Sequence, residues 1–161
     1  MKRTPLNRGK GLNRKKPMSR QPRTEKAQAK AETWRLFSLY IRYRDSLKTT
    51  GTLTECACVT CGRVKPTRAR NGIQAGHFIQ GRHNSIIYDE RQVRGQCQYC
   101  NDKLKGNWVP YRAFMVREYG EAVVDELIER DKLTETWSVG ELEALQVELR
   151  AKIEAMGGSV E

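Results

Sequence analysis

The sequence predicts an α+β fold that is mostly helical, with a small cysteine-rich module between an N-terminal helix and several C-terminal helices. Three observations support this prediction. Apolar residues recur at helical spacing on both sides of the middle of the chain. The middle holds two Cys-x-x-Cys pairs, Cys58 with Cys61 and Cys97 with Cys100. The chain has 161 residues and an apolar fraction of 38%, which indicates one domain with a small core and a large polar surface.

The expected division of the chain follows its composition. Residues 1–23 contain nine Lys or Arg and no acidic residue, so we expect a disordered basic tail. Residues 24–51 are the N-terminal helix, residues 52–118 the cysteine module, and residues 119–161 the acidic C-terminal helices. The net charge of +11 gathers on the tail and the module, which favours a polyanionic partner. We interpret the tail as an arm that adds phosphate contacts, with a solubilising tail as the alternative.

The N-terminal helix is predicted from apolar spacing over residues 24–48. Thr24 can cap its start, and Gly51 follows its end. Its apolar stripe includes Trp34 and Phe37. We expect these aromatic rings to pack in the core rather than to form a platform for stacked bases, because a long helix must bury one stripe to be stable.

The cysteine module is expected to contain two short strands. Residues 73–79 and residues 86–88 are the candidates. Residues 64–72 are rich in turn-forming and basic residues, which indicates a positively charged loop. Asn107 and Pro110 mark the start of the helix that follows.

The C-terminal part is expected to be helical, with a break at Gly120. Ser138 and Glu141 have the spacing of a capping box, which predicts the start of the last helix. Apolar residues at helical spacing define the faces that we expect to be buried. They are Tyr111, Phe114, Met115, Tyr119, Val123, Val124, Leu127, Ile128, Leu142, Leu145, Leu149 and Ile153.

The two cysteine pairs are spaced to hold one tetrahedral Zn²⁺ through Cys58, Cys61, Cys97 and Cys100. Four thiolates close the coordination sphere, so this zinc would hold the fold and do no Lewis-acid work. Cys56 could compete with Cys58, but the Cys-x-x-Cys spacing is the commoner one. Buried thiols without a metal are the alternative.

The order of the motifs resembles the zinc-bound, treble-clef form of the ββα-metal module, also called HNH or His-Me finger. His77 lies at the end of a strand candidate, and Asn101 directly follows the second cysteine pair. The resemblance implies that His77 is the general base that activates water. It also implies that Asn101 binds one divalent cation, Mg²⁺ or Mn²⁺, at the scissile phosphate. A neutral imidazole suits such work, and an ordinary strand histidine is the alternative.

Longer strings resemble the NinG (Rap) recombination endonucleases of lambdoid phages. These strings are Gln74-Ala75-Gly76-His77-Phe78-Ile79, Gly81-Arg82-His83-Asn84, Asp89-Glu90-Arg91, Gln96-Cys97, Cys100-Asn101 and Gly106-Asn107. The resemblance covers residues 30–155. It implies a structure-specific, metal-dependent endonuclease that hydrolyses branched DNA, such as Holliday junctions and D-loops, during phage recombination. The cytoplasm of the infected bacterial host is the expected location.

Three positions depart from the patterns of these families. Gln92 stands where the NinG family commonly has Asn, and its amide is expected to orient His77. Arg94 replaces a His, which removes a potential metal ligand and adds a phosphate contact. Gly76 stands where many HNH nucleases have a metal-binding Asp, so the second ligand of the catalytic cation is open. The candidates are His83, Asp89, Asn84 and Glu90.

Five basic residues of the module are candidates for phosphate contacts, with ordinary solvated charge as the alternative. They are Arg82, Arg91, Arg94, Lys103 and Lys105. Trp108 could stack on an unpaired base or pack against the helix that follows. The alternative function is a non-catalytic zinc-finger module that binds branched or single-stranded DNA.

Branched DNA is the expected partner. No apolar run reaches the length needed to span a bilayer, so we expect no membrane partner. The acidic C-terminal helices would pack internally or form a protein interface. Such an interface could make a homodimer matched to the two-fold symmetry of a junction, or contact phage or host recombination proteins.

Overall fold

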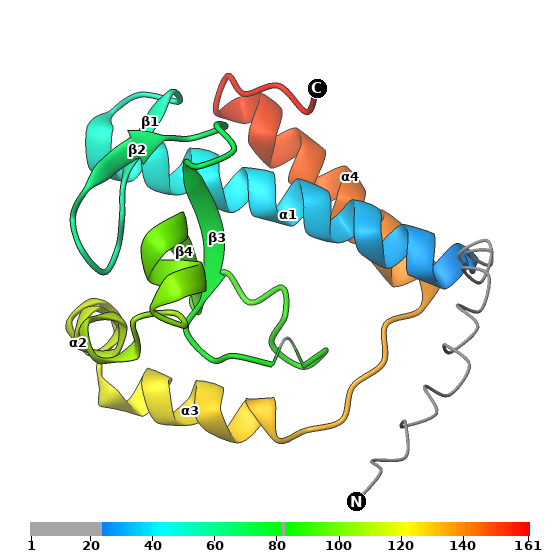
Figure 1. The fold of residues 1–161 in the computed structure, drawn as a ribbon. Coiled ribbons are helices and arrows are strands. Elements are labelled where there is room, and N and C mark those ends of the chain that lie inside the picture. The colour runs from blue at the N-terminus through cyan, green and yellow to red at the C-terminus, as the bar shows by residue number, and fades with distance from the viewer. Residues whose placement is uncertain (1–23, 82) are drawn as a thin grey trace, which may run out of the picture.

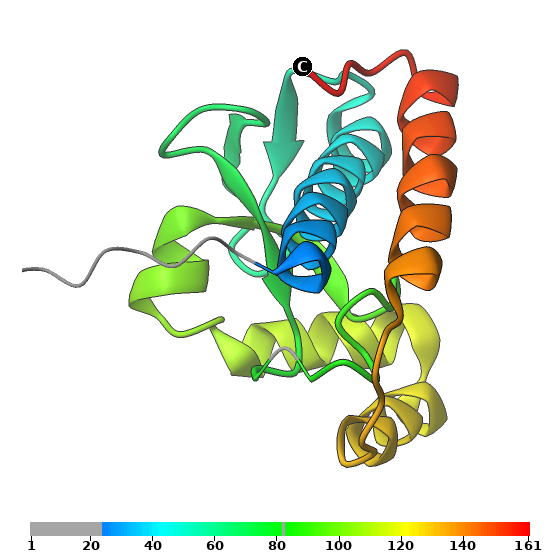
Figure 2. The ribbon, with the colours of Figure 1, turned by 90° about the vertical axis from the view of Figure 1, so that its right-hand side faces the viewer.

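The computed structural model describes residues 24–81 and 83–161, and its fold is α+β. The long helix α1 (Glu25–Thr50) runs through the molecule, and helix α4 (Val139–Ala155) lies along one side of it (Figure 1). The two small sheets lie against α1, whereas the shorter helices lie farther from it and pack on each other (Figure 2). The expected basic tail and Arg82 lie outside the described residues.

Helix α1 begins and ends as its sequence predicts. The Thr24 hydroxyl accepts a hydrogen bond from the backbone N–H of Ala27, which satisfies one of the free donors of the first turn. Gly51 ends the helix in the left-handed conformation at φ 71° and donates its N–H to the Leu47 carbonyl. Glycine adopts this conformation without a steric penalty.

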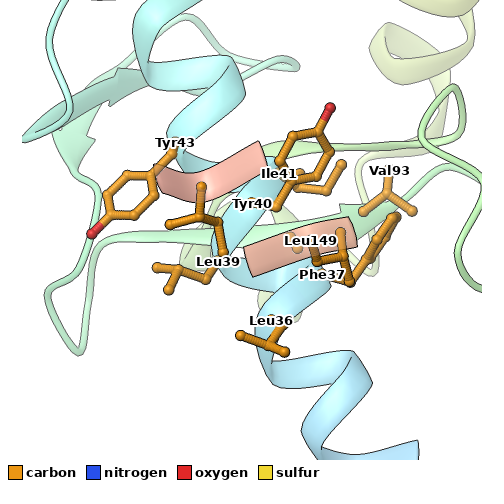
Figure 3. Close-up of a cluster of buried hydrophobic side chains, with 10 residues drawn as sticks. Leu36, Phe37, Leu39, Tyr40, Ile41, Tyr43, Val93 and Leu149 are labelled. Carbon is orange, nitrogen blue, oxygen red and sulfur yellow. The ribbon is translucent and has the colours of Figure 1, made fainter. Parts of the chain in front are cut away.

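The main core forms where α1, α4 and the sheet that contains Val93 meet (Figure 3). Phe37 and Ile41 of α1 are buried there with Leu149 of α4 and Val93 of the sheet. Thr33 of α1 contacts the Leu142 carbonyl of α4. Further along α1, Tyr43 donates its hydroxyl to the carbonyl of Ser159, which follows the end of α4. The two helices therefore run in the same direction, and the first and last helices of the chain share one core.

The two sheets are antiparallel pairs. Strand β1 (Glu55–Ala57) pairs with β2 (Val64–Pro66), and the first cysteine knuckle forms the turn between them. Strand β3 (Ile73–His77) pairs with β4 (Val93–Cys97), with His77 opposite Val93 and Ile73 opposite Cys97. This register places His77 at one end of the second sheet and the second cysteine pair at the other.

Two sequence-based expectations are wrong in this region. Residues 86–88 form turns rather than a strand: Ile86 and Ile87 donate their N–H groups to the His83 carbonyl. Their apolar character serves a buried turn, since Ile86 is 1% exposed. Residues 64–72 are not wholly loop, because the first three form β2.

The remaining helices follow the second cysteine pair. A π-helical turn, η1 (Tyr99–Lys103), leads to α2 (Trp108–Tyr119), and Gly120 separates α2 from α3 (Glu121–Asp131). Ser138 and Glu141 form the expected capping box at the start of α4. The expected buried faces are largely confirmed, but Ile128 is 38% exposed and lies outside the core.

Within the described residues, no helix combines the length and the apolar character that a membrane crossing requires.

Candidate metal centre and cleft

The four predicted zinc ligands come together. The sulfur atoms of Cys58, Cys61, Cys97 and Cys100 all lie within 4.8 Å of one another. The Cys61 and Cys97 sulfurs are 3.8 Å apart. Tetrahedral Zn–S bonds of about 2.3 Å separate sulfur atoms by about 3.8 Å. The cluster therefore has the size and donor set of a structural zinc site, with β1–β2 supplying one pair and the end of β4 the other.

The surroundings of the cluster favour the thiolate at Cys58 and the neutral thiol at Cys61. Burial raises the pKa of the Cys58 thiol, but hydrogen bonds from the Thr60 hydroxyl and from backbone N–H groups outweigh burial and lower that pKa to about 7. Burial and the neighbouring Cys58 sulfur raise the pKa of Cys61 to about 12. Several thiolates this close repel one another, so a cation is needed to hold all four sulfurs deprotonated.

Cys56 is not part of the cluster. Its side chain is fully buried, and its Sγ accepts a 3.8 Å hydrogen bond from the Thr49 hydroxyl. Burial raises the pKa of this thiol to about 11. A methyl group at Gly95 would approach the Cys56 sulfur to 2.9 Å, so the thiol fills the space behind β4. Cys56 is a packing residue.

His77 and Asn101 lie on the same cleft, which we call the His77 cleft. Its volume is about 350 Å³. It is lined by Ala75, His77, Gln80, Gly81, Asn101, Asp102 and Lys105. The strand β3 contributes His77, and the π-helical turn η1 contributes Asn101. The four-cysteine cluster includes residues at the end of β4 and in η1, so it helps to position Asn101 in the cleft.

The Asn101 amide has a defined orientation. Its Nδ2 donates to Gln74 Oε1 at 2.6 Å. Its Oδ1 lies 3.2 Å from the position that a Cβ at Gly76 would occupy. The oxygen therefore faces the β3 backbone beside His77. Larger residues at Gly76 would also collide with the Gln96 side chain, which explains why glycine and not aspartate precedes this histidine.

One contact holds the His77 ring, and another holds the backbone next to it. Trp34 of α1 stacks on it with ring centroids 4.9 Å apart and planes inclined by 19°. On the backbone side, the Tyr111 hydroxyl donates to the Gly76 carbonyl at 2.8 Å, which ties α2 to the strand next to His77. The side chain is only 8% exposed. Trp34 therefore joins the site from the first helix, a role that the sequence does not reveal.

Gln92 organises the loop after His77. Its Oε1 accepts from the Ile79 N–H at 3.2 Å, and its Nε2 donates to the Ile86 carbonyl at 2.8 Å. Its carbonyl accepts the N–H of Phe78, the residue after His77. The amide thus fixes the backbone on both sides of the turn that follows the histidine.

The other candidate cation ligands do not line the His77 cleft. His83 Nδ1 lies 2.8 Å from Asp131, and Asn84 lines the same separate hollow. Asp89 forms ion pairs with Arg91 and Arg130, each at 2.8 Å. Glu90 pairs with Lys152 of α4 at 2.7 Å and accepts the Tyr40 hydroxyl. Asp89 and Glu90 therefore stabilise the fold through ion pairs.

The candidate phosphate-binding residues differ in their exposure and in their ion-pair partners. Lys103 and Lys105 are exposed, and Lys105 lines the His77 cleft. Arg91 is bound by Asp89 and Glu126, which raise its pKa well above the ordinary arginine value.

Arg94 is the correction in this set. Its side chain is 3% exposed, and its guanidinium lies 5.4 Å from the Phe114 ring and 5.2 Å from the Tyr119 ring. Its Nη1 also lies 3.4 Å from Asp45. The guanidinium is almost wholly removed from solvent, so Arg94 packs in the interior rather than forming an exposed phosphate contact.

Trp108 packs on Phe78 with one face of its ring. Its ring stacks on Phe78 with centroids 6.2 Å apart and planes inclined by 13°. The side chain is 52% exposed, so its other part faces solvent beside the start of α2.

A second hollow continues the cleft and contains residues that the sequence does not single out. We call it the Arg70 hollow; its volume is about 400 Å³. It is lined by Trp34, Ser38, Arg42, Ala69, Arg70, Ile73, Gln74, Ala75, Asn101 and Asp102. Ala75, Asn101 and Asp102 line both hollows. The two hollows form a groove with Lys105 towards one end and Arg42 and Arg70 towards the other. Sequence position alone could have drawn attention to Asp102 and Gln74. Asp102 directly follows Asn101, and Gln74 lies two residues before Gly76-His77.

Comparisons with known proteins agree on one family. A family model described as Bacteriophage Lambda NinG protein matches residues 5–158. Similar curated proteins, each named Protein ninG, come from Salmonella phage P22, Escherichia phage 933W and Escherichia phage lambda, with 31%, 29% and 28% identity over 121 residues. The alignments cover 74% of this chain and 53% or 54% of the relatives, so the chain spans about half the length of the curated relatives it matches. No solved structure matches.

Proposed function

The chain belongs to the bacteriophage NinG family, and on that premise we propose that it is a structure-specific endonuclease that cuts branched DNA by metal-assisted hydrolysis. Its substrates would be recombination intermediates such as Holliday junctions and D-loops, in the cytoplasm of the infected host. The observation that carries the proposal is the His77 cleft, where a buried imidazole and an oriented amide oxygen share one basic groove.

In this proposal His77 accepts a proton from the attacking water. The Trp34 ring and the Tyr111 hydrogen bond to the preceding carbonyl hold the imidazole in place. A general base must sit within hydrogen-bond reach of its water in a fixed orientation, and these contacts supply the orientation. Gln92 supports the same arrangement by fixing the backbone after the histidine.

A divalent cation, Mg²⁺ or Mn²⁺, would supply positive charge against the developing charge on the phosphate and on the leaving oxygen. The cleft fits such a cation because it offers the Asn101 oxygen and a carboxylate, donors that hard cations prefer. The four-cysteine zinc would have no part in this chemistry, since its coordination sphere is closed by protein ligands.

The groove also suggests how a DNA strand would lie. Lys105 borders the His77 cleft, and Arg42 and Arg70 border the Arg70 hollow. Cations at both ends of a groove can bind successive phosphates and place the one between them next to the base. None of these side chains needs to read base edges, which suits an enzyme that selects DNA by shape.

The test is cleavage of a synthetic four-way junction with Mg²⁺ or Mn²⁺ by the wild-type protein and by His77→Ala. Loss of a general base is expected to slow cleavage by about 10²- to 10⁴-fold, with junction binding retained. His83→Ala is the matched comparison, because this second histidine pairs with Asp131 in a separate hollow. We expect it to cut like the wild type.

Equal cutting by wild type and His77→Ala would remove His77 as the base. Salt-sensitive junction binding by the wild type with no cleavage under any divalent cation would instead support a non-catalytic zinc-finger module. Sedimentation equilibrium of the protein, free and bound to the junction, tests whether the unit that binds is a homodimer.

A further inference from the structure

We propose that Asp102 is the carboxylate ligand of the divalent cation in the His77 cleft, and that Gln74 positions Asp102 and Asn101 to bind it. The cation is a hard divalent ion, Mg²⁺ or Mn²⁺. The inference rests on the proposed function, which is what requires such a cation in this cleft. Asp102 takes the place of His83 and Asp89 as the candidate ligand, because His83 pairs with Asp131 and Asp89 pairs with two arginines.

The Gln74 side chain contacts both proposed ligands of the cation, Asn101 and Asp102. Gln74 Oε1 accepts from Asn101 Nδ2 at 2.6 Å, and Gln74 Nε2 donates to Asp102 Oδ2 at 3.3 Å. Because the amide nitrogen of Asn101 is held by Gln74, its oxygen points away from Gln74 and towards the strand beside His77. Gln74 is therefore a positioning residue: it orients the Asn101 amide and fixes Oδ2 of Asp102, whose Oδ1 accepts from Asn101 Nδ2 at 3.5 Å.

The Asp102 carboxylate is available to a cation. Among residues 24–81 and 83–161, no lysine, arginine or histidine forms a salt bridge with it, whereas Asp89 has two arginine partners. Asp102 is exposed and lines the His77 cleft with Asn101 and His77. Its negative charge is thus not neutralised within the described fold, in a groove that is otherwise bordered by cations.

The backbone gives these two ligands adjacent positions. Asn101 and Asp102 are consecutive residues of the π-helical turn η1. Turns of this kind are rare and occur often at functional sites. After the turn, the Gly106 N–H is shared between the carbonyls of Cys100 and Asn101, so the zinc-bound cysteine and the proposed ligand are fixed by the same backbone contact.

The donor set predicts how tightly the cation binds. Mg²⁺ sites commonly use one or two carboxylates, several waters and the substrate phosphates. One carboxylate and one amide oxygen should therefore bind Mn²⁺ weakly in the free protein and more tightly when junction DNA supplies a phosphate.

The experiment measures Mn²⁺ binding directly, by electron paramagnetic resonance of free Mn²⁺, on zinc-loaded protein with and without a four-way junction. The samples with junction carry His77→Ala so that the DNA stays intact. Asp102→Asn is expected to weaken Mn²⁺ binding at least about tenfold, and Gln74→Ala by about tenfold. Asp125→Asn is the matched control, because this exposed carboxylate lies on α3, outside the residues that line the cleft. Zinc content and circular dichroism confirm that each variant is folded.

A charge exchange tests the positioning role. The double variant Gln74→Glu with Asp102→Asn moves the carboxylate across the 3.3 Å contact to the strand. If the pair acts as one unit, this variant regains most of the Mn²⁺ affinity that Asp102→Asn loses. A merely structural role for Gln74 predicts no recovery, and failure to recover overturns the positioning role.

Two results separate this inference from the proposed function. If Asp102→Asn binds Mn²⁺ as tightly as the protein with Asp102 intact, or the His77→Ala protein binds none with the junction present, the ligand assignment is overturned, whatever the junction-cleavage assay gives. If Mn²⁺ binding depends on Asp102 but the wild type cuts no junction, the ligand assignment stands and the nuclease proposal fails.

Discussion

At the scale of single residues, the chemistry gathers where side chains far apart in the sequence touch. The ring of Trp34 on α1 stacks on His77 of β3, so the first helix forms one wall of the proposed site. Helical spacing indicates that Trp34 packs inwards, and it does. Spacing cannot reveal that its neighbour is the histidine, because that contact depends on how a helix and a sheet meet.

The sequence points to residues that match the ββα-metal motif, but it does not point to the residues that support them. His77 and Asn101 line one cleft, as expected from the motif order. Gln74 and Asp102 were not singled out, because each is an ordinary polar residue until the fold brings it beside Asn101. Arg94 misleads in the opposite way: an arginine in a basic module suggests a surface contact, yet aromatic rings cover it.

Asp89 makes a pH-dependent contribution to stability that can be measured. Burial raises its pKa, but hydrogen bonds and ion pairs with Arg91 and Arg130 outweigh burial and lower the pKa below the usual 3.8. A carboxyl with a lowered pKa stabilises the fold above its unfolded pKa, near pH 4. That contribution disappears as the pH falls through the folded pKa.

We therefore expect Asp89→Asn to cost on the order of 1–3 kcal/mol of unfolding free energy at pH 7. The loss should shrink as the pH falls through the folded pKa of Asp89, because the wild-type carboxyl then becomes protonated too. Urea unfolding at several pH values measures it, and Asp125→Asn should change stability by less than about 0.5 kcal/mol. A loss that does not shrink as the pH is lowered would exclude the ion pairs as its source.

At the scale of elements, caps and spacing predict the helices and fail for the second strand. Thr24, Gly51 and the Ser138–Glu141 capping box mark real helix ends, because capping is a local hydrogen-bond pattern. Strand β4 reads Val-Arg-Gly-Gln-Cys, and all five residues are buried. Gln96 donates to the Gly106 carbonyl. Polar residues with buried partners leave no apolar alternation, so the apolar run at 86–88 looked like the better strand.

The pairing of α4 with α1 should depend on a few buried residues of α4. Leu149 is 1% exposed and belongs to the main core, whereas Val147 on the same helix is 70% exposed. Leu149→Ala is expected to lower the unfolding free energy by about 2–5 kcal/mol, through lost burial and the cavity left behind. Val147→Ala should change it by less than about 0.5 kcal/mol. Chemical denaturation of both variants decides the point, and similar values would mean that α4 contributes little to the core.

At the scale of the whole molecule, the four-cysteine cluster joins the hairpin β1–β2 to the end of β4 and the start of η1. The sequence predicts this centre well, since two Cys-x-x-Cys pairs leave few other interpretations. We expect chelation to unfold the module over residues 52–118 rather than to empty a rigid site, because a small core depends on such a metal.

Thiol labelling distinguishes these outcomes. The zinc-bound protein should label slowly, since the metal protects four cysteines and Cys56 is fully buried with a pKa raised to about 11 by burial. After chelation all five cysteines should label, with loss of structure by circular dichroism. Labelling of four cysteines with Cys56 still protected would mean that the module keeps its core without metal. Cys56→Ala should retain one zinc, and Cys97→Ala should lose it.

The parallel pairing of the first and last helices has a consequence for biosynthesis. While the ribosome is still adding residues before Val139, Leu36 and Ile41 of α1 have no α4 to cover them. This part of the core can close only after α4 has emerged, which gives the fold contacts of long sequence separation and slow closure. The nascent protein therefore exposes the part of the α1 apolar face that α4 covers until residue 155 has been made, and a general chaperone that binds such faces should raise the yield of folded protein.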